Sequence, residues 1–226
     1  MVVCRLFYFS YGLFHGLTKY VAYVINISSN GVGNIRKDNF MPTGRSSSTD
    51  LRVRKSIRDI KRAVLVLIAK EPFEQIRIEE IAREAMINRK TFYNHFSSKT
   101  EVLHAIEDDM VDEQKQALDA LEPDDLKGGL LAFYKLLNTN DAAYQALFTE
   151  DEYAEFFGEL VNRIFTLDFY THFYQKAQYP EIMPGYFSSA AAIYRKWAVQ
   201  DGKKESLEEL ATLTARLFSN GMDGLR

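Results

Sequence analysis

Apolar side chains from Leu51 onward recur every three or four residues, the spacing of one face of an α-helix. In residues 51–70, LRVRKSIRDIKRAVLVLIAK, basic groups occupy the opposite face. No later stretch shows the strict alternation that is typical of a half-buried strand. The sequence therefore predicts an all-α fold. Its first helix should bury a stripe made of Ile57, Ile60, Val64, Leu67 and Ile68.

Helix breakers and caps divide the rest of the chain into further helices. Pro72 ends the first helix, because proline cannot continue the backbone hydrogen bonds. Ser98 and Glu101 form a capping box for a helix that reaches about Leu121 and stops at Pro123. The other predicted helices cover residues 78–85, 89–96, 125–138, 141–148, 151–177, 185–200 and 205–220, with breaks at 86–88, 138–140, 180–184 and 201–202.

Charge is distributed unevenly along the chain, although the net charge of all 226 residues is only −3. Residues 45–106 carry 13 basic and 8 acidic side chains, whereas residues 107–226 carry 11 basic and 22 acidic ones. A basic block that precedes an acidic body favours a polyanion as the partner of the basic block alone. Charges that merely solvate helices give the same pattern, so a motif has to decide between the two interpretations.

The first 40 residues are aromatic and β-branched, but polar side chains interrupt every apolar run before it reaches the roughly 18 residues of a membrane span. We therefore expect neither a membrane anchor nor a signal peptide. The single cysteine, Cys4, fits a reducing cytoplasm. Residues 36–50, RKDNFMPTGRSSSTD, are predicted to be a linker, and Met41 within them is expected to be the native start.

Residues 76–96 contain two short predicted helices and a tight turn, the arrangement of a helix-turn-helix. The first helix should face inward through Ile78, Ile81 and Ala82, and the second through Phe92 and Phe96. With those two phenylalanines in the core, helical geometry places the remaining polar side chains on the exposed face. One exposed row is Arg89 and Tyr93, and the next is Lys90 and Asn94.

These exposed groups are ones that contact DNA. Arginine and lysine reach guanine or phosphate, asparagine pairs with adenine, and tyrosine reaches phosphate or a thymine methyl. A helix that carries them fits the major groove with its N-terminal residues toward the bases. Asn88 is the predicted N-cap, which leaves neighbouring backbone N–H groups near phosphates.

Residues 76–103 resemble the DNA-binding domain of the tetracycline-repressor (TetR) family. Their sequence is IRIEEIAREAMINRKTFYNHFSSKTEVL. The likeness rests on an Ile-Ala pair, a tight turn, TFYNHF and a lysine that opens the next helix, and it spans about residues 52–106. It implies a DNA-binding domain at 51–106 and a helical ligand-binding and dimerisation domain at 107–226, after an unfolded extension and linker at 1–44.

The resemblance also implies roles for single residues. Tyr93, His95 and Lys99 are expected to touch phosphates, residues 88–94 to include the base readers, and the first helix to bring basic groups near the backbone. For His95, local packing is an equally good interpretation. The complete predicted DNA-binding set is Arg52, Arg54, Lys55, Arg77, Asn88, Arg89, Lys90, Thr91, Tyr93, Asn94, His95 and Lys99.

Two positions depart from the pattern of the family. Arg77 stands where threonine is usual, which removes a helix cap worth about 1 kcal/mol but supplies a charge for phosphate. Met86 stands in the turn where glycine is usual and would tolerate positive φ, so we expect a slightly different turn geometry.

The acidic body carries no motif of similar strength. In the family, the last two long helices of two subunits form a four-helix dimer interface, which corresponds here to residues 185–200 and 205–220. Burial within one chain is the alternative. The C-terminal segment also resembles regulators related to the dihydroxyacetone-operon activator. The apolar residues expected at the interface are Ile193, Trp197, Leu207, Leu210, Leu213 and Leu217.

A ligand pocket is predicted within residues 155–174. If this segment is one helix, Phe165 lies on its apolar face and Asp168 and His172 fall at the centre of that face, four residues apart. An ionisable pair on a buried face is a candidate ligand site. The alternative is that the core ends earlier and both side chains lie in water.

These observations predict a cytoplasmic, homodimeric repressor that binds a pseudo-palindromic operator and responds to an unidentified small-molecule or protein effector. The alternatives are an activator of the same family, or an interaction adaptor that has lost DNA binding. An enzyme is not expected, because the chain has only four histidines, no Gly-rich phosphate loop and no Gly-x-Ser-x-Gly elbow. For the same reason we expect no cofactor and no metal site.

Overall fold

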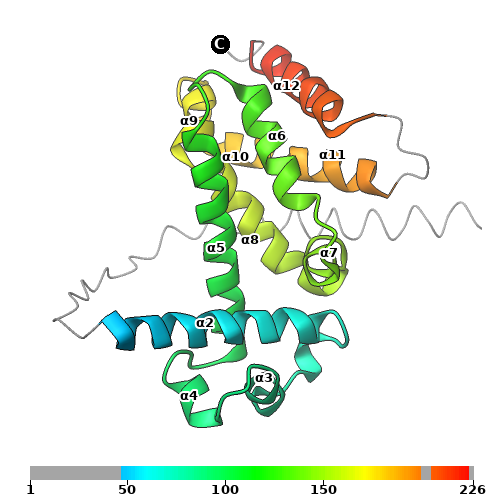
Figure 1. The fold of residues 1–226 in the computed structure, drawn as a ribbon. Coiled ribbons are helices and arrows are strands. Elements are labelled where there is room, and N and C mark those ends of the chain that lie inside the picture. Colours follow the sequence, from blue (N-terminus) through cyan, green and yellow to red (C-terminus); the bar gives the residue numbers. More distant parts are fainter. Residues whose placement is uncertain (1–46, 200–204, 224–226) are drawn as a thin grey trace, which may run out of the picture. The chain divides into compact units, whose positions relative to one another are not determined.

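The computed structural model describes residues 47–199 and 205–223, and the regular elements within these ranges are helices (Figure 1). No strand occurs in these ranges, so the predicted all-α fold class is confirmed. The predicted extension, the start at Met41 and the break at 201–202 lie outside the described residues. None of the described helices is both long enough and apolar enough to cross a membrane.

Three helices and a short 3-10 turn contain the predicted helix-turn-helix. They are α2 (Ser47–Ile68), η1 (Phe73–Gln75), α3 (Ile78–Glu84) and α4 (Arg89–Tyr93). Because α2 begins at Ser47, the last four residues of the predicted linker 36–50 are helical, which corrects that boundary. The predicted stripe of α2 faces the core, and Ile60 and Val64 on it are fully buried.

The long helix α5 (Lys99–Asp119) links this part to the rest of the fold. It packs against α2 on one side of the molecule and against α6 and α8 further along its length. Figure 1 shows α5 rising from beside α2 toward α9. The side chain of Ser98 caps its first turn by accepting from the Glu101 N–H at 3.1 Å, which is half of the predicted capping box. The Glu101 carboxylate accepts from the backbone N–H and the hydroxyl of Ser97 rather than from Ser98.

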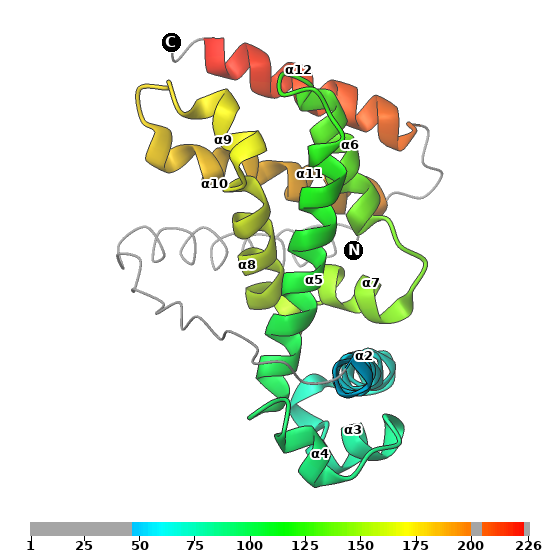
Figure 2. The same cartoon turned by 60° about the vertical axis from the view of Figure 1, so that its left-hand side comes forward.

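The remaining helices form the body of the fold. α12 packs against α6 and α11, and these three helices lie at the end of the body away from α2 (Figure 2). The elements of the body are α6 (Leu126–Leu137), α7 (Ala142–Thr149), η2 (Asp151–Tyr153), α8 (Ala154–Phe165), α9 (Asp168–Tyr174), η3 (Pro180–Ile182), α10 (Met183–Phe187), α11 (Ser189–Ala198) and α12 (Leu207–Asp223).

The prediction of one helix over 151–177 is wrong, because the chain turns between α8 and α9. The hydroxyl of Thr166 donates to two carbonyl oxygens of the preceding turn, at 3.0 and 2.9 Å. Such a bond competes with the backbone bonds that would continue the helix. Leu167 is extended, with ψ 149°, and α9 starts afresh from it. The new direction carries Tyr170 into the core.

Aromatic rings fill the centre of the body. The ring of Phe165 lies 4.9 Å from that of Phe133 and 4.7 Å from that of Tyr170, measured between centroids. The Tyr170 hydroxyl donates to the carbonyl of Gly129 at 2.8 Å and accepts from the side chain of Gln114 at 3.1 Å. Burial raises the pKa of Tyr170 well above its ordinary value. The hydroxyl is therefore a neutral anchor between α5, α6 and α9.

The predicted helix over 185–200 is also divided. α10 ends at Phe187 and α11 begins at Ser189, with the Ser188 hydroxyl donating to the carbonyl of Pro184 at 2.7 Å. Pro184 lies in the first turn of α10, so the predicted break at 180–184 holds η3 and the start of α10 instead.

The apolar residues predicted for a dimer interface fall into two groups. Leu210 and Trp197 are buried within the chain, where Leu210 joins the core between α12 and the body. Ile193 and Leu207 are partly buried and pack against the same core. Leu213 and Leu217 are 53% and 52% exposed and lie four residues apart on α12. Only the last pair offers a free apolar surface, because the core has already taken the other side of α12.

Candidate nucleic-acid interface

The core beneath the candidate interface is made by the residues that the sequence predicts. Ile81 and Ala82 of α3 are buried, as are Phe92 of α4 and Phe96 just after it. α4 is shorter than expected and ends at Tyr93, where Asn94 caps it. Phe96 still reaches the core, because its N–H donates to the Phe92 carbonyl at 3.0 Å and continues the turn.

The turn after α3 takes the left-handed form that glycine usually provides. Met86 has φ 55°. The N–H of Ile87 donates to the Ala82 carbonyl at 2.9 Å and that of Met86 to the Arg83 carbonyl at 3.1 Å, the two bonds of a Schellman motif. The expectation of a different turn geometry is therefore wrong. Methionine adopts the glycine conformation, at a cost of about 1–2 kcal/mol.

Asn88 starts α4 as predicted. Its side-chain oxygen accepts from the N–H of Thr91 at 2.7 Å and from the hydroxyl of Thr91 at 3.1 Å. This cap is worth about 1 kcal/mol, which is substantial for a helix of five residues. Thr91 is thereby turned toward Asn88 and is only partly exposed.

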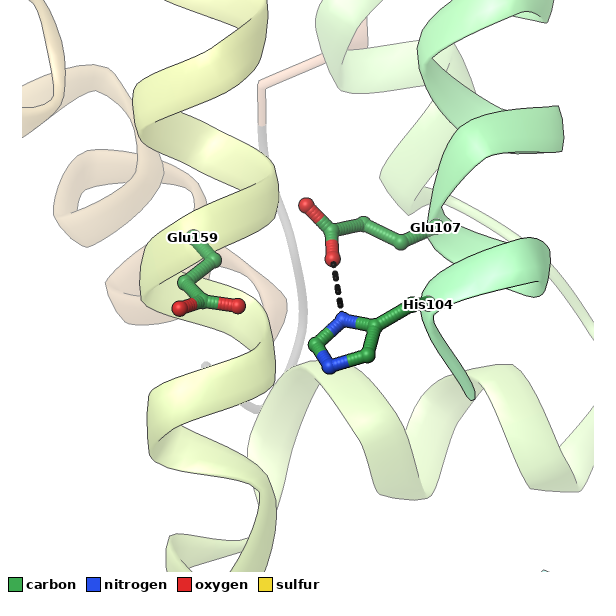
Figure 3. Close-up of side chains that lie close together, drawn as sticks. All are labelled: His104, Glu107 and Glu159. Atoms are coloured by element: carbon green, nitrogen blue, oxygen red, sulfur yellow. Dashed lines mark ion pairs between the residues drawn. The ribbon is translucent and has the colours of Figure 1, made fainter. Parts of the chain in front are cut away.

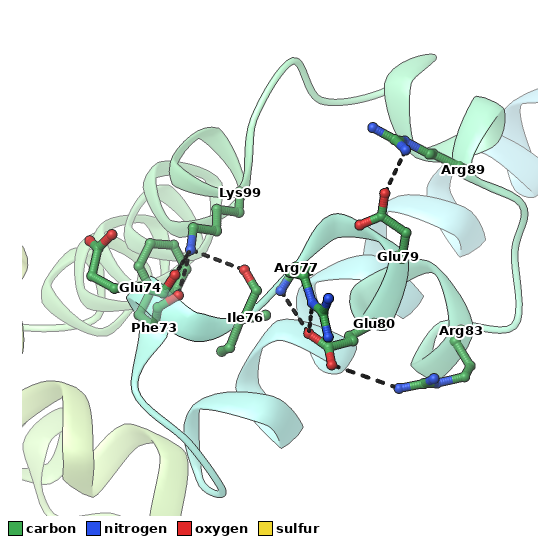
Figure 4. A network of polar contacts seen from close by, with 9 residues as sticks. All are labelled: Phe73, Glu74, Ile76, Arg77, Glu79, Glu80, Arg83, Arg89 and Lys99. Carbon is green, nitrogen blue, oxygen red and sulfur yellow. Dashed lines mark hydrogen bonds and ion pairs between the residues drawn. The ribbon is translucent and has the colours of Figure 1, made fainter.

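Basic, phenolic and amide groups form the outer face of α4. Arg89, Lys90, Tyr93 and Asn94 are all exposed, as helical geometry predicts from the burial of the phenylalanines. The Arg89 guanidinium donates to the Tyr93 hydroxyl at 3.2 Å and pairs with Glu79 of α3 (Figure 4). Sequence reasoning missed Glu79, because that ion pair depends on the angle between the two helices. The pair is exposed and costs little to open.

Lys99 makes contacts within the chain that were not predicted, and its predicted phosphate contact stays a prediction. Its ammonium group donates to the carbonyls of Phe73, Glu74 and Ile76 at 2.6, 2.9 and 3.0 Å (Figure 4). It also lies 4.7 Å from the centre of the Phe73 ring. An ammonium group has three N–H donors, so all of them are used. Lys99 holds the segment between α2 and α3, and a phosphate contact would require it to release these carbonyls.

Arg77 does not supply the cap that threonine would. The backbone N–H of Arg77 donates to the Glu80 carboxylate at 2.9 Å, and the side-chain Nε of Arg77 lies 3.5 Å from the same carboxylate. The backbone bond from Arg77 lowers the pKa of Glu80. A carboxylate near a helix N-terminus is favourable. The Glu80 carboxylate therefore satisfies the backbone N–H of Arg77, which is the half of a capping box that needs no hydroxyl at position 77, and the exposed Arg77 guanidinium is held beside it.

The other predicted DNA contacts are on α2 and just after α4. Arg52, Arg54 and Lys55 are exposed on α2. His95 is half-buried at the end of the turn after α4, a position consistent with either interpretation of its role. The interface is therefore a cationic helix face with further basic groups on α2.

The predicted ligand residues do not lie on one helix face. Phe165 ends α8 and is fully buried, whereas Asp168 and His172 are exposed on α9. The expected Asp168–His172 bond is absent from this part of the structure, and His172 Nε2 lies 2.9 Å from Asp124 Oδ1 instead. Asp168 and His172 do line an open hollow of ≈ 370 Å³ beside the end of α5. The other residues of the hollow are Leu118, Asp119, Leu121, Pro123 and Phe169.

The segment that contains α4 also matches a known protein family. Residues 60–106 match the family of bacterial regulatory proteins called the tetR family. The chain carries a tetR-family domain. The match covers the end of α2, the helix-turn-helix and the start of α5. No curated protein matches the chain at a significant level.

Solved structures show that the likeness in fold extends beyond the tetR-family domain. A TetR transcriptional regulator from Streptococcus agalactiae 2603V is 19% identical with a TM-score of 0.61. The dihydroxyacetone kinase operon activator DhaS is 22% identical with a TM-score of 0.51. Each alignment covers 76% of this chain and 98% of the other. The body of this chain therefore shares the fold of those proteins.

Proposed function

We propose that this protein is a transcription regulator that binds double-stranded DNA through α4. The observation that carries the proposal is the division of α4 into two faces. Phe92 fixes one face in the core, and Arg89, Lys90 and Tyr93 point outward from the other. These are the groups that read base edges and phosphates in the major groove. Arg52, Arg54 and Lys55, which are exposed on α2, would add contacts to the DNA backbone.

We propose that the protein acts as a homodimer through α12. Leu213 and Leu217 expose apolar surface on the side of α12 that the body leaves uncovered. Tyr186 continues this surface, because its hydroxyl donates to the carbonyl of Leu217 at 3.2 Å and its side chain is exposed. Exposed apolar patches of this kind mark protein interfaces. Two copies would then present two α4 helices to successive major grooves.

The response to an effector is assigned to the hollow at the end of α5. Asp168 and His172 border it, and Phe169 supplies an apolar wall. A ligand there would touch both α9 and α5, and α5 leads directly from the helix-turn-helix. We assume that the dimer has one arrangement that fits DNA and one that does not. The ligand then changes DNA binding only if its affinity differs between these two arrangements.

Repression is the proposed direction of control, following the resemblance of the motif. DhaS, which has the same fold, is named as an operon activator, so activation is the alternative direction of control. A reporter gene behind the selected operator distinguishes the two, because deletion of the regulator raises expression under repression and lowers it under activation.

DNA binding is tested by selecting bound duplexes from a random pool and measuring anisotropy at two salt concentrations. Removing Arg89 and Lys90 together, as Arg89→Ala/Lys90→Ala, should weaken binding by about 10-fold or more and reduce its salt dependence. The matched control removes two exposed lysines of the body, Lys127→Ala/Lys176→Ala. Absence of any salt-sensitive DNA binding by the full chain, or equal losses in both double variants, would overturn the proposal and favour the adaptor.

The dimer is tested separately by sedimentation. Leu213→Asp/Leu217→Asp should convert the dimer to a monomer, because two charges cannot be buried without partners. Val199→Asp places a charge at another exposed apolar residue and should leave the dimer intact. A monomeric wild-type chain at micromolar concentration would remove the dimer from the proposal.

A further inference from the structure

A histidine and two glutamates from two different helices converge in the body. His104 and Glu107 lie three residues apart on one face of α5, and Glu159 approaches from α8 (Figure 3). One ligand atom from each of the three side chains lies within 4.8 Å of the others. We propose that these three side chains bind a divalent first-row transition metal ion, with Zn²⁺ as the probe. This site was not expected from the sequence.

Glu107 is the residue that makes this cluster more than a group of surface charges. Its side chain is about as buried as the core, with 1% exposed. Oε1 is paired with the guanidinium of Arg163, whose Nη1 lies 3.0 Å away. Oε2 faces His104 Nδ1 at 3.6 Å. A buried carboxylate is costly unless cationic groups share its charge, and a metal ion at Oε2 would add to the pairing that Arg163 gives Oε1.

Arg163 fits the site as a supporting residue. It approaches Oε1 of Glu107 and also donates to Asp108 at 2.7 Å. Carboxylates that bind metal ions are generally held by a second polar partner, which orients the coordinating oxygen. With Oε1 directed toward Arg163, Oε2 remains on the side of His104. The guanidinium would therefore position Glu107, and Oε2 is the oxygen that would bind the ion.

The donor set selects the class of metal ion. One imidazole nitrogen and two carboxylate oxygens suit Zn²⁺ and its neighbours, whereas Mg²⁺ and Ca²⁺ prefer sites made of oxygen alone. The His104 side chain is 57% exposed, which leaves one side of the site open to water. Three protein ligands and water are the coordination of an open zinc site.

The geometry requires only a small closure. Ligand atoms at about 2.1 Å from one ion lie about 3.5 Å from each other, so the widest pair must approach by about 1 Å. Rotation of the exposed His104 and the half-buried Glu159 side chains supplies such a movement. The bound ion would then join α5 to α8. Without the ion, the two helices are held together by their packing and by the ion pair of Arg163 with Glu107.

The site is tested by equilibrium dialysis of the full, untagged chain against Zn²⁺, with Mg²⁺ in excess as competitor. We expect one Zn²⁺ per chain, and a loss of affinity of about 10-fold or more in His104→Ala and in Glu159→Gln. Glu155→Gln is the matched control and should bind as the wild type does. Glu155 lies one turn before Glu159 on α8.

Two results would overturn the site. One is the absence of Zn²⁺ binding by the wild-type chain. The other is unchanged binding in both His104→Ala and Glu159→Gln, which would place any bound ion elsewhere. Circular dichroism of each variant shows whether it is folded. Glu107→Gln is left out of the test, because it would leave Arg163 without its buried partner.

A regulatory role for the ion rests on the proposed function. α5 begins six residues after α4 ends, so a tie between α5 and α8 restricts how the reading helix can move. DNA affinity should change several-fold with Zn²⁺ in the wild type and remain constant in Glu159→Gln. Zinc binding without any DNA binding would remove the proposed function and leave the site. Constant DNA affinity in the wild type would remove the regulatory role.

Discussion

The helix-turn-helix and the body of this protein are held together in different ways. α4 has five residues, and local bonds define it: the Asn88 cap at its start and the Schellman motif before it. In the body, rings from separate helices pack against one another, and the turn between α8 and α9 places Tyr170 against Phe165. In the helix-turn-helix, polar side chains therefore remain exposed for a partner. In the body, the large side chains pack against one another.

The difference teaches where a change of sequence should act. In the helix-turn-helix, most contacts join residues a few positions apart, so substitutions should have modest and separable effects. In the body, one ring contacts several helices, so its removal should be felt widely. Lys99 is an exception within the helix-turn-helix part of the chain. Its side chain bonds to carbonyls more than 20 residues away, so its removal should act over a distance, as in the body.

The largest effect is expected for Phe165→Ala. Phe165 is fully buried among the rings of Phe133, Tyr170 and Phe187, so its removal leaves a cavity and should lower the free energy of unfolding by about 3–5 kcal/mol. Urea unfolding followed by circular dichroism measures the loss. Tyr179→Ala, at an exposed aromatic, should cost less than about 0.5 kcal/mol. Similar losses in the two variants would contradict the ring-based account of the body.

The next effect is expected for Lys99→Met. This change keeps the apolar part of the side chain but removes its bonds to three carbonyls, and it should cost about 2–3 kcal/mol of stability. Lys90→Met, on the outer face of α4, should leave stability unchanged and weaken DNA binding. If Lys99→Met left the unfolding free energy intact while DNA affinity fell, Lys99 would be a phosphate contact after all.

A smaller effect of opposite sign is expected for Met86→Gly. Glycine adopts φ 55° without the steric cost that methionine bears there, so the variant should gain about 1 kcal/mol in thermal or urea unfolding. Met86→Ala keeps the cost and should match the wild type. A gain of the same size in Met86→Ala would assign the effect to the exposed methionine side chain rather than to the backbone.

The smallest effect is expected in acid. The N–H of Arg77 lowers the pKa of Glu80 below its ordinary value, and that of Ser97 does the same for Glu101. Because the folded pKa is the lower one, each carboxylate contributes stability above pH 4.5 that is lost as the pH falls through the folded value. Unfolding free energy measured from pH 6 to about pH 3 should therefore decline less steeply in Glu80→Gln than in Glu84→Gln. Equal slopes would show that this bond is not maintained in solution.

Much of the fold could be predicted from local pattern. The helices at α3, α5, α6 and α7 begin and end within about two residues of their predicted bounds, because caps and prolines next to them mark the ends. The prediction failed where no breaker marks the turn. Residues 151–177 contain neither proline nor a glycine at the turn, and at the break the Thr166 hydroxyl bonds to carbonyls of the preceding turn while Tyr170 packs against Phe165.

The candidate interface could be predicted for a similar reason. Burial of Phe92 and Phe96 follows from their spacing, and exposure of Arg89, Lys90 and Asn94 follows from that burial. The part that could not be predicted involves partners distant in sequence. Lys99 bonds to carbonyls near Phe73, and these partners are set by the path of the chain between α2 and α3.

By itself, the sequence determined that the chain is helical, which residues of the helix-turn-helix face inward, and which cationic face remains outside. These properties follow from spacing and capping, which act over one or two helical turns. Only the tertiary structure decided the division of α8 from α9, the bonds of Lys99, and the meeting of His104 and Glu107 with Glu159. These features depend on how separate helices pack against each other. Residues that meet through such packing are not spaced in the sequence in any recognisable pattern, so the sequence alone does not reveal them.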